Sequence, residues 1–130
     1  ARFDERKPLI SPDGNWIAFT TNETSKESLT DIRLYNRKRD EVIALPEMNS
    51  TAMDTEPAMS TDGRFLAFVS DRVAGEGVRD VYLYDRQEQQ LLPTPGLNSA
   101  GQEQSPSISP DGRFIAFVSE RLDATGERDI

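Results

Sequence analysis

Aspartates at a fixed spacing carry the chemistry most readily suggested by this chain, because three carboxylates in a ring could bind a cation. Each is followed by glycine, and the pairs recur every 49 residues: Asp13-Gly14, Asp62-Gly63 and Asp111-Gly112. Calcium prefers such oxygen ligands. However, turn aspartates also bond the backbone of their own loop, and consecutive repeats would hold the three groups too far apart to share an ion. The sequence therefore favours a structural role, and we expect no metal and no cofactor.

A second set of aspartates keeps the same period, at Asp31, Asp80 and Asp129. An arginine precedes the last two, so these residues could form a charged ring for binding. The alternative is that each aspartate opens a strand and hydrogen-bonds loop backbone in its own or the adjacent repeat. This structural role explains why the period is kept without error, and we prefer it.

The chain lacks the residues of the common nucleophilic mechanisms. A Ser-His-Asp or Cys-His arrangement requires a base that titrates near neutral pH. The chain has no histidine and no cysteine, and no G-x-S-x-G nucleophile elbow. We therefore predict that it is not an enzyme. If its parent protein is one, the catalytic residues lie outside this segment.

The composition predicts a globular protein and limits its partners. The 130 residues are 35% hydrophobic and carry a formal net charge of −8. Acidic residues spread along the chain would repel phosphate backbones, so we expect no nucleic-acid partner. No apolar run approaches the roughly 20 residues that span a bilayer, and the first residues, ARFDERKP, lack the apolar core of a signal peptide. We expect no membrane insertion.

The aspartate-glycine pairs belong to a longer repeat with a period of 49 residues. Its other fixed positions are Pro8, Pro57 and Pro106, Ser11, Ser60 and Ser109, and the pairs Ala18-Phe19, Ala67-Phe68 and Ala116-Phe117. A period near 50 is typical of propellers and other repeat arrays.

The patterns within one repeat predict strands, and none has the i, i+3, i+4, i+7 spacing of a helix. In the second repeat a first strand over 57–60 begins with Pro57, where the missing N–H does least harm. A tight hairpin turn at the Asp-Gly pair leads to a second strand over 64–70. Strands over 80–84 and 90–92 follow. Each repeat is therefore expected to form one four-stranded antiparallel sheet.

The second strand, RFLAFVS at 64–70, is apolar on both of its alternating faces. Both faces must then be covered, and neighbouring repeats can cover them. Sheets stacked in this way around a ring form a β-propeller, so the predicted fold class is all-β, built of propeller blades. The aromatic residues on strands are expected to pack between blades: Trp16, Tyr35, Tyr82 and Tyr84.

The repeat resembles the TolB-type β-propeller repeat, a relative of the WD40-like repeats. The likeness rests on Pro106, residues 109–112 and 115–119, Arg121 and residues 128–130, with their counterparts upstream. It implies a ring of six blades, whereas residues 1–130 hold about two and two-thirds repeats, at 8–56, 57–105 and 106–130, the last incomplete. We expect a fragment of a larger propeller. The alternative is a short chain that completes a ring by self-association through unpaired blades.

Segments that diverge between the repeats are free to serve a function. They are the loops between the second and third strands and the connections from one repeat to the next. Both emerge on the same side of an up-and-down sheet, which predicts one variable, charged face. Drift in exposed loops explains the divergence equally well. The candidate partner-binding residues on this face are Asn22, Glu23, Lys26, Arg72, Glu76, Arg79, Arg121, Asp123 and Glu127.

The function that we prefer is a non-enzymatic scaffold that binds a protein partner through these loops. One alternative is a regulatory propeller domain that gates a prolyl oligopeptidase-like serine peptidase, whose catalytic domain is absent from this chain. Another is a short repeat protein that only completes a ring with itself. The resemblance to TolB-type repeats implies a periplasmic or otherwise exported bacterial protein.

Overall fold

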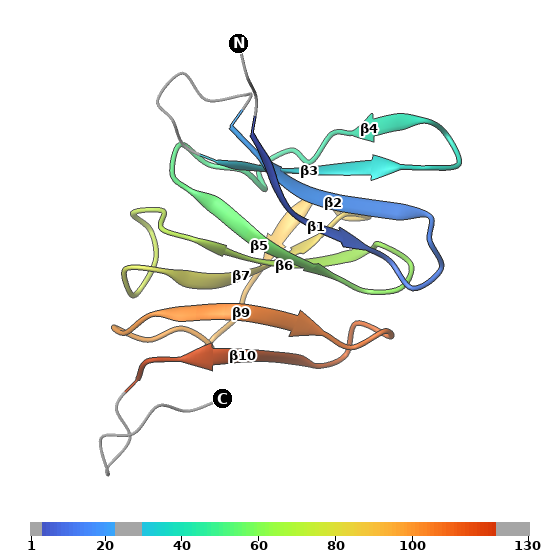
Figure 1. Cartoon of the computed structure of the whole chain (residues 1–130). Coiled ribbons are helices and arrows are strands. Elements are labelled where there is room, and N and C mark those ends of the chain that lie inside the picture. The colour runs from blue at the N-terminus through green and yellow to red at the C-terminus, as the bar shows by residue number, and fades with distance from the viewer. Residues whose placement is uncertain (1–3, 23–29, 122–130) are drawn as a thin grey trace.

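The computed structural model describes residues 4–22 and 30–121, which form strands and turns without a helix (Figure 1). The strands are β1 (Glu5–Ile10), β2 (Trp16–Thr21), β3 (Asp31–Asn36), β4 (Glu41–Ile43), β5 (Asp54–Met59), β6 (Phe65–Ser70), β7 (Asp80–Asp85), β8 (Gln90–Leu92), β9 (Glu103–Ile108) and β10 (Ile115–Ser119).

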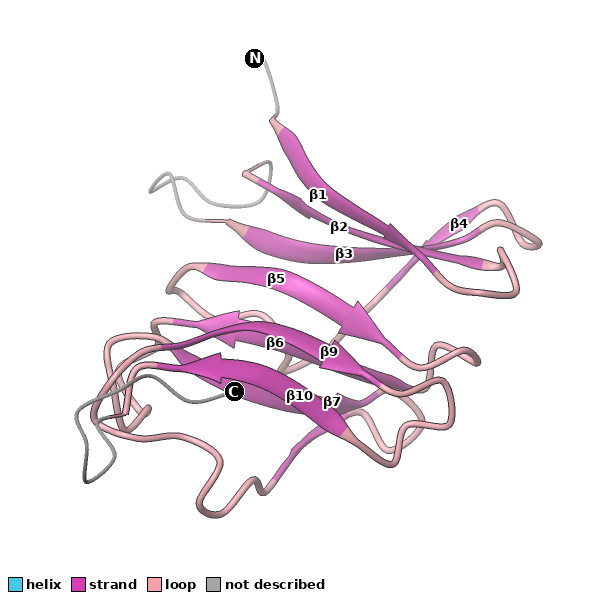
Figure 2. Ribbon diagram, turned by 60° about the horizontal axis from the view of Figure 1, so that its bottom comes forward, coloured by secondary structure: helices cyan, strands magenta, loops and turns pink. Residues whose placement is uncertain are grey.

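The strands form three sheets that follow one another in chain order. Strands β1 to β4 and β5 to β8 make two four-stranded antiparallel sheets, which we call blade 1 and blade 2. Strands β9 and β10 make a two-stranded sheet, which we call blade 3. Figure 1 shows the three sheets layered one over the next, and Figure 2 shows the described residues as strands joined by loops. The prediction of an all-β fold built of stacked propeller blades is confirmed.

The turn at each aspartate-glycine pair is closed by the same hydrogen bonds. In blade 2 the Gly63 N–H donates to the Ser60 carbonyl at 3.0 Å, and Gly63 has φ 66°, which favours glycine. The Ser60 hydroxyl donates to Asp62 Oδ1 at 2.6 Å, and Asp62 Oδ1 also accepts from the Arg64 N–H at 3.0 Å. These two bonds lower the pKa of Asp62. Asp13 and Asp111 bond in the same way within their own turns.

The first strand of each blade (β1, β5 and β9), which we call the inner strand, pairs with the second strand through a bulge. The predicted start of this strand at Pro57 is wrong. Strand β5 begins at Asp54 rather than at Pro57, and its pairing with β6 shifts register between Thr55 and Ala58. Glu56, within the bulge, has φ 54°, and Lys7 and Ser105 repeat this conformation. Proline is tolerated at a bulge because no ladder hydrogen bond is lost there. The repeat bounds 8–56, 57–105 and 106–130 therefore fall inside the inner strands.

The central strand of blade 2 is covered on both faces, as its apolar pattern requires. Leu66 and Phe68 on one face of β6 and Ala67 and Val69 on the other are all fully buried. Tyr84 is buried with them, and its hydroxyl donates to the Pro46 carbonyl, in the segment that leaves blade 1, at 2.8 Å. Burial of this apolar surface between sheets is the main force that joins the blades.

Successive blades also meet through an aromatic ring that lies on a turn glycine. A Cβ at Gly63 would stand 2.9 Å from the ring of Trp16 in blade 1. A Cβ at Gly112 would stand 2.5 Å from the ring of Phe65 in blade 2. Trp16 therefore packs between blades as predicted. Tyr35 does not, because it lies half-buried on the face of blade 1 that no other blade covers.

Replacing Gly63 with alanine should destabilise the protein more than the same change at Gly96. Both glycines have positive φ, 66° and 72°, so each alanine should cost about 1 kcal/mol of backbone strain. Only the methyl group at position 63 meets an aromatic ring, which should add about 1–3 kcal/mol of overpacking, whereas nothing lies within 4 Å at Gly96. Urea denaturation of Gly63→Ala and Gly96→Ala measures the difference. Equal losses would show that the ring contact is not tight.

Candidate functional site

The two kinds of variable segment meet at one end of the blades. The Met53 N–H donates to Asp71 Oδ1 at 2.7 Å, and the Asp71 N–H donates to the Met53 carbonyl at 3.3 Å. Met53 ends the connection from blade 1 to blade 2, and Asp71 begins the loop from β6 to β7. We call this end the loop face: residues 44–53, 71–79 and 93–102, with Asn22 and Arg121.

The structure places five of the nine predicted partner-binding residues, and all five lie at the loop face. They are Asn22, Arg72, Glu76, Arg79 and Arg121. The other four, Glu23, Lys26, Asp123 and Glu127, lie outside the described residues, as does Asp129 of the repeat set. The five differ sharply in how much of each side chain is free to meet a partner.

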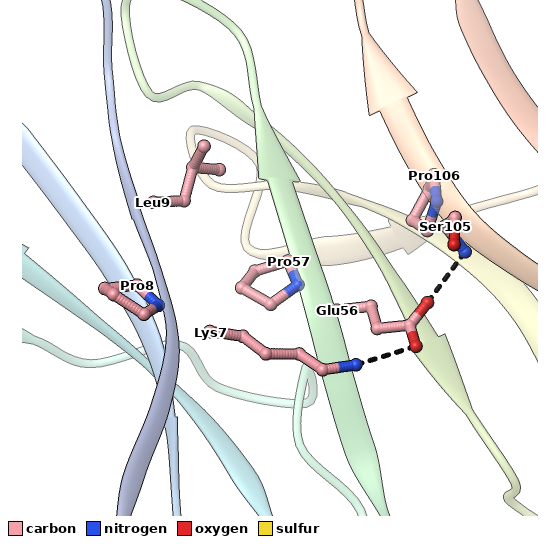
Figure 3. A pocket seen from close by; sticks show the side chains of 7 residues that line it. All are labelled: Lys7, Pro8, Leu9, Glu56, Pro57, Ser105 and Pro106. Atoms are coloured by element: carbon pink, nitrogen blue, oxygen red, sulfur yellow. Dashed lines mark hydrogen bonds and ion pairs between the residues drawn. The ribbon is translucent and has the colours of Figure 1, made fainter.

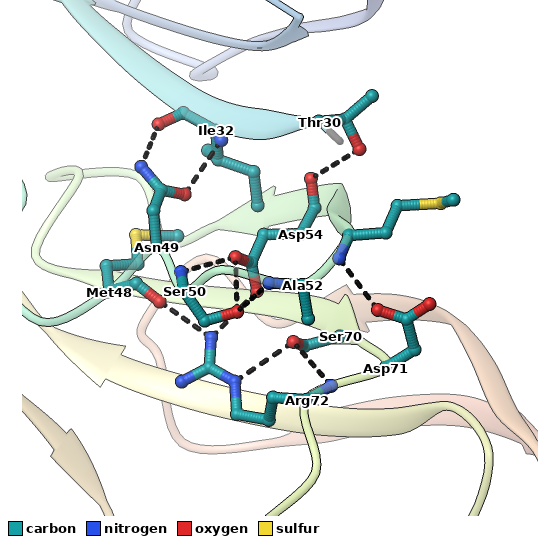
Figure 4. Close-up of polar contacts among 11 residues, drawn as sticks. Thr30, Ile32, Met48, Asn49, Ser50, Ala52, Asp54, Ser70, Asp71 and Arg72 are labelled. Atoms are coloured by element: carbon teal, nitrogen blue, oxygen red, sulfur yellow. Dashed lines mark hydrogen bonds and ion pairs between the residues drawn. The ribbon is translucent and has the colours of Figure 1, made fainter. Parts of the chain in front are cut away.

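Arg72 is committed to contacts inside the protein (Figure 4). Its Nη2 donates to the Met48 carbonyl at 2.7 Å and pairs with Asp54 at 2.7 Å, while its Nε donates to Ser70 Oγ at 2.9 Å. The side chain is only 12% exposed, and Asp54 is fully buried. The guanidinium also lies over the ring of Tyr82, 4.5 Å from its centroid. Arg72 therefore joins the segment that leaves blade 1 to two strands of blade 2.

Arg121 repeats this arrangement one period later. It donates to the Leu97 carbonyl and, through Nε, to Ser119 Oγ at 3.0 Å. Its carboxylate partner is the fully buried Glu103, 4.0 Å away. Arg72 and Arg121 stand 49 residues apart, as do Ser70 and Ser119. That shared period is the feature of the sequence that indicated their structural role. We call them latches, because each joins its blade to the connection that leaves the preceding blade.

Two asparagines that the sequence analysis missed clamp the third strand of each complete blade. Asn49 accepts from the Ile32 N–H at 2.8 Å and donates to the Ile32 carbonyl at 2.9 Å. Asn98 makes both bonds with Val81, each at 2.9 Å. The fourth strand pairs with only the last part of the third, so each side-chain amide replaces a missing strand partner. Their spacing of 49 residues was again the available signal.

The loop from β6 to β7 is folded over a buried carboxylate. Asp80 opens β7, is buried, and accepts from the Gly77 N–H at 3.2 Å. Burial raises the pKa of this carboxyl group. A Cβ at Gly75 would stand 1.8 Å from Asp80 Oδ2, so the loop passes directly against it. Asp31 opens β3 in the same way, and burial raises its pKa too. These contacts give the loop a fixed shape.

The same loop presents apolar side chains to solvent. Val73 is fully exposed and Val78 is 66% exposed, on either side of the exposed Glu76. Arg79 is turned inward and pairs with Glu56 at 3.3 Å. Both valines are absent from the predicted contact residues, because that prediction rested on polar and charged side chains. Of the predicted residues on this loop, Glu76 is the one that faces outward.

The three inner strands, β1, β5 and β9, line a groove that is drawn in Figure 3. It has a volume of about 300 Å³ and is lined by Lys7, Pro8, Leu9, Glu56, Pro57, Ser105 and Pro106. The three bulge residues differ from blade to blade, although the prolines that follow them are constant. A variable residue before a constant proline, repeated every 49 residues, was therefore the feature of the sequence that indicated this groove.

Glu56 holds the three inner strands together within this groove. It accepts from Lys7 Nζ at 2.8 Å and from the Ser105 N–H at 2.7 Å. Burial acts to raise the pKa of Glu56, but these hydrogen bonds and the charges of Lys7 and Arg79 outweigh it and hold the pKa below its ordinary value. The carboxylate is therefore ionised at neutral pH. It pairs with two cations, Lys7 and Arg79, and accepts from one backbone N–H.

Residues 4–22 and 30–121 contain no group of three or more acidic side chains placed to hold a metal ion. The same residues contain no helix that is long and apolar enough to cross a membrane.

Known structures share this arrangement of blades. TolB from Acinetobacter baumannii is 27% identical with a TM-score of 0.61, and the match covers 85% of this chain and 25% of that one. A putative TolB from Agrobacterium tumefaciens is 20% identical with a TM-score of 0.64, over 89% of this chain and 39% of that one. The Pyrococcus horikoshii acylaminoacyl peptidase is 16% identical with a TM-score of 0.62, over 91% of this chain and 17% of that one.

The repeat, the stacked four-stranded sheets and these likenesses define a β-propeller. Within that class the chain is a TolB-like β-propeller in its fold. It spans about a quarter and two-fifths of the length of the two TolB structures. No protein-family model and no curated protein sequence matches it.

Removing the Arg72 guanidinium should destabilise the protein severely. Arg72→Met keeps the apolar contacts but leaves the carboxylate of Asp54 buried without its cation, which should cost about 3–5 kcal/mol. Arg39→Met is the control, because Arg39 and Glu41 form an exposed pair at 3.6 Å that should be worth less than about 1 kcal/mol. Guanidinium denaturation measures both. A loss below 1 kcal/mol for Arg72→Met would mean that this arginine is not a latch.

Glu56→Gln should make the free energy of unfolding less dependent on pH between pH 7 and pH 3. Because the folded protein lowers the pKa of Glu56, its contribution is present above the ordinary glutamate pKa of about 4.3 and is lost as pH falls through the lower folded value. The variant should therefore be less stable than the wild type at pH 7, by about 1.5–3 kcal/mol, and the gap should narrow towards pH 3. Urea denaturation at several pH values tests this, with Glu5→Gln, exposed on β1, as control. A gap that stays constant with pH would contradict the assignment.

Proposed function

We propose that this chain is part of a non-enzymatic scaffold of the TolB-like propeller type, which binds a protein partner at its loop face. The observation that supports this function is the loop from β6 to β7, which holds Val73 and Val78 in solvent on a backbone fixed over Asp80. A rigid loop loses little conformational entropy on binding, so burial of its apolar side chains contributes directly to affinity.

The chemistry of this surface favours a protein over other partners. Two exposed valines beside a charged residue resemble a small interface, with apolar side chains at the centre and a polar rim. The net charge of −8 disfavours nucleic acid. Arg72 and Arg121 are used inside the fold, so the contact residues that we propose are Val73, Glu76 and Val78, with Asn22 after β2 in blade 1, where its side chain accepts from the Asp4 N–H.

The absence of histidine and cysteine from the sequence supports a scaffold rather than a catalyst. The likeness to the acylaminoacyl peptidase favours a second function, a propeller domain that regulates a serine peptidase. The neighbouring coding sequence separates the two, because a scaffold predicts further repeats and a peptidase predicts a hydrolase domain with its nucleophile elbow. The TolB-like fold supports an exported, periplasmic location.

Charge placed on the loop should abolish partner binding. Val73→Asp combined with Val78→Asp removes the apolar contact and should weaken retention of a bound protein at least tenfold, since apolar residues at the centre of an interface commonly contribute more than about 1.4 kcal/mol. The measurement is affinity capture on the immobilised chain from an extract of exported bacterial proteins, quantified by mass spectrometry. Gln89→Asp combined with Gln87→Asp is the control, because both glutamines are exposed at the opposite turn. If the loop variant and the control retain the same proteins, the loop is not the binding site.

A further inference from the structure

Blade 3 has one exposed face, which carries the counterparts of residues that the neighbouring blade covers in blades 1 and 2. Phe114 follows the turn of blade 3 as Trp16 and Phe65 follow the turns of blades 1 and 2. Those two rings are covered by the turn glycine of the next blade, whereas Phe114 is 68% exposed. Ala116 is exposed as well, although its counterparts Ala18 and Ala67 are fully buried.

Blade 1 has the opposite open face. Ile10 is 55% exposed, whereas its counterpart in blade 2, Met59, is 6% exposed because it packs against blade 1. Phe19 is only half-buried, although its counterpart Phe68 is fully buried. Phe19 and Ile17 help to line an apolar hollow of about 270 Å³ on this face. The free face of blade 1 therefore corresponds to the face through which blade 2 packs against blade 1.

The turn of blade 1 contains the same two residue types, a glycine and an arginine, that contact an aromatic ring in blade 2. In blade 2, Arg86 Nε donates to the Gly63 carbonyl at 2.8 Å, and the guanidinium lies 4.2 Å from the centre of the Trp16 ring. In blade 1, Arg37 Nη1 donates to the Gly14 carbonyl at 2.7 Å. Among the described residues, only Arg37 lies within 4 Å of a Cβ at Gly14, with its Nη1 at 3.4 Å. The arginine thus bonds the carbonyl of the turn glycine as in blade 2, although through Nη1 rather than Nε, and no aromatic ring of the described residues lies on this glycine.

We propose that two copies of this chain associate head to tail, with Phe114 of one copy lying on Gly14 beneath Arg37 of the other. The contact would repeat the junction that the chain already makes between blades 1 and 2. A cation over an aromatic ring and the burial of both apolar faces stabilise it. Along the inner strands it brings Lys7 opposite Ser105, so no like charges meet at these two positions. At the ring, Arg37 would lie on Phe114 together with Arg113, whose guanidinium is 5.8 Å from the ring centroid. One such contact leaves a free face at each end, so the interface is heterologous, and two copies can close into a ring.

Sedimentation equilibrium over roughly 5–500 μM tests the association. The wild-type chain, of 14.6 kDa, should gain mass with concentration and reach at least two copies. Phe114→Ala and Arg37→Ala should each raise the midpoint concentration at least tenfold. The controls are Met53→Ala, which removes an exposed apolar side chain from the loop face, and Arg39→Ala, which removes an exposed arginine from the same turn as Arg37. Both controls should associate as the wild type does.

Mixing the two variants distinguishes head-to-tail association from a symmetric contact. The Phe114→Ala chain keeps an intact socket and the Arg37→Ala chain keeps an intact ring, so an equimolar mixture should form a dimer through one wild-type interface. A mixture that stays monomeric would overturn the proposal. So would wild-type chains that remain monomeric at 500 μM, which would indicate that these faces take only a covalently linked blade, or a Phe114→Ala chain that associates normally.

Discussion

The fold depends on one constraint, which is that a sheet with two apolar faces is stable only when another sheet lies against each of them. Leu66 and Phe68 on one side of β6, and Ala67 and Val69 on the other, leave no face that water could cover without loss of stability. Blade 2 satisfies the constraint because it lies between blades 1 and 3. The outer blades satisfy it on one side only, and their free faces carry the exposed Ile10 and Phe114. The same requirement thus explains both the regular repeat and the two surfaces at which the stack is incomplete.

The contacts between blades fall into three zones. On the inner strands, Glu56 joins the blades through Lys7 and the Ser105 backbone. At the end that carries the aspartate-glycine turns, aromatic rings lie on the turn glycines of the next blade. At the opposite end, the loop face, Arg72 and Arg121 hold the connecting segments. Because these zones carry the contacts between blades, the tips of the loops lie outside them, and the valines of the β6–β7 loop are exposed.

Much of the fold could be predicted from the sequence, because the period of 49 residues and the doubly apolar strand leave few architectures. The prediction that the inner strand begins at Pro57 is wrong, because β5 begins at Asp54 and continues past Pro57 with a bulge at Glu56. The site was less predictable. Charge suggested that Arg72 faces a partner, whereas its burial depends on a distant backbone carbonyl that no local pattern reveals. Val73 and Val78 were not among the predicted contact residues, and their exposure follows only from the path of the loop over Asp80.

Amide hydrogen exchange, resolved by residue, tests most directly whether blade 2 is the doubly covered sheet on which the others depend. Protection reflects the free energy needed to expose each backbone hydrogen bond. The account predicts that the amides of β6 and β7 exchange most slowly, at the rate set by global unfolding. Those of β2 and β3 should exchange faster, and those of β10 faster still, because its outer face is open. Equal protection in all three blades, or slower exchange in β10 than in β6, would contradict it.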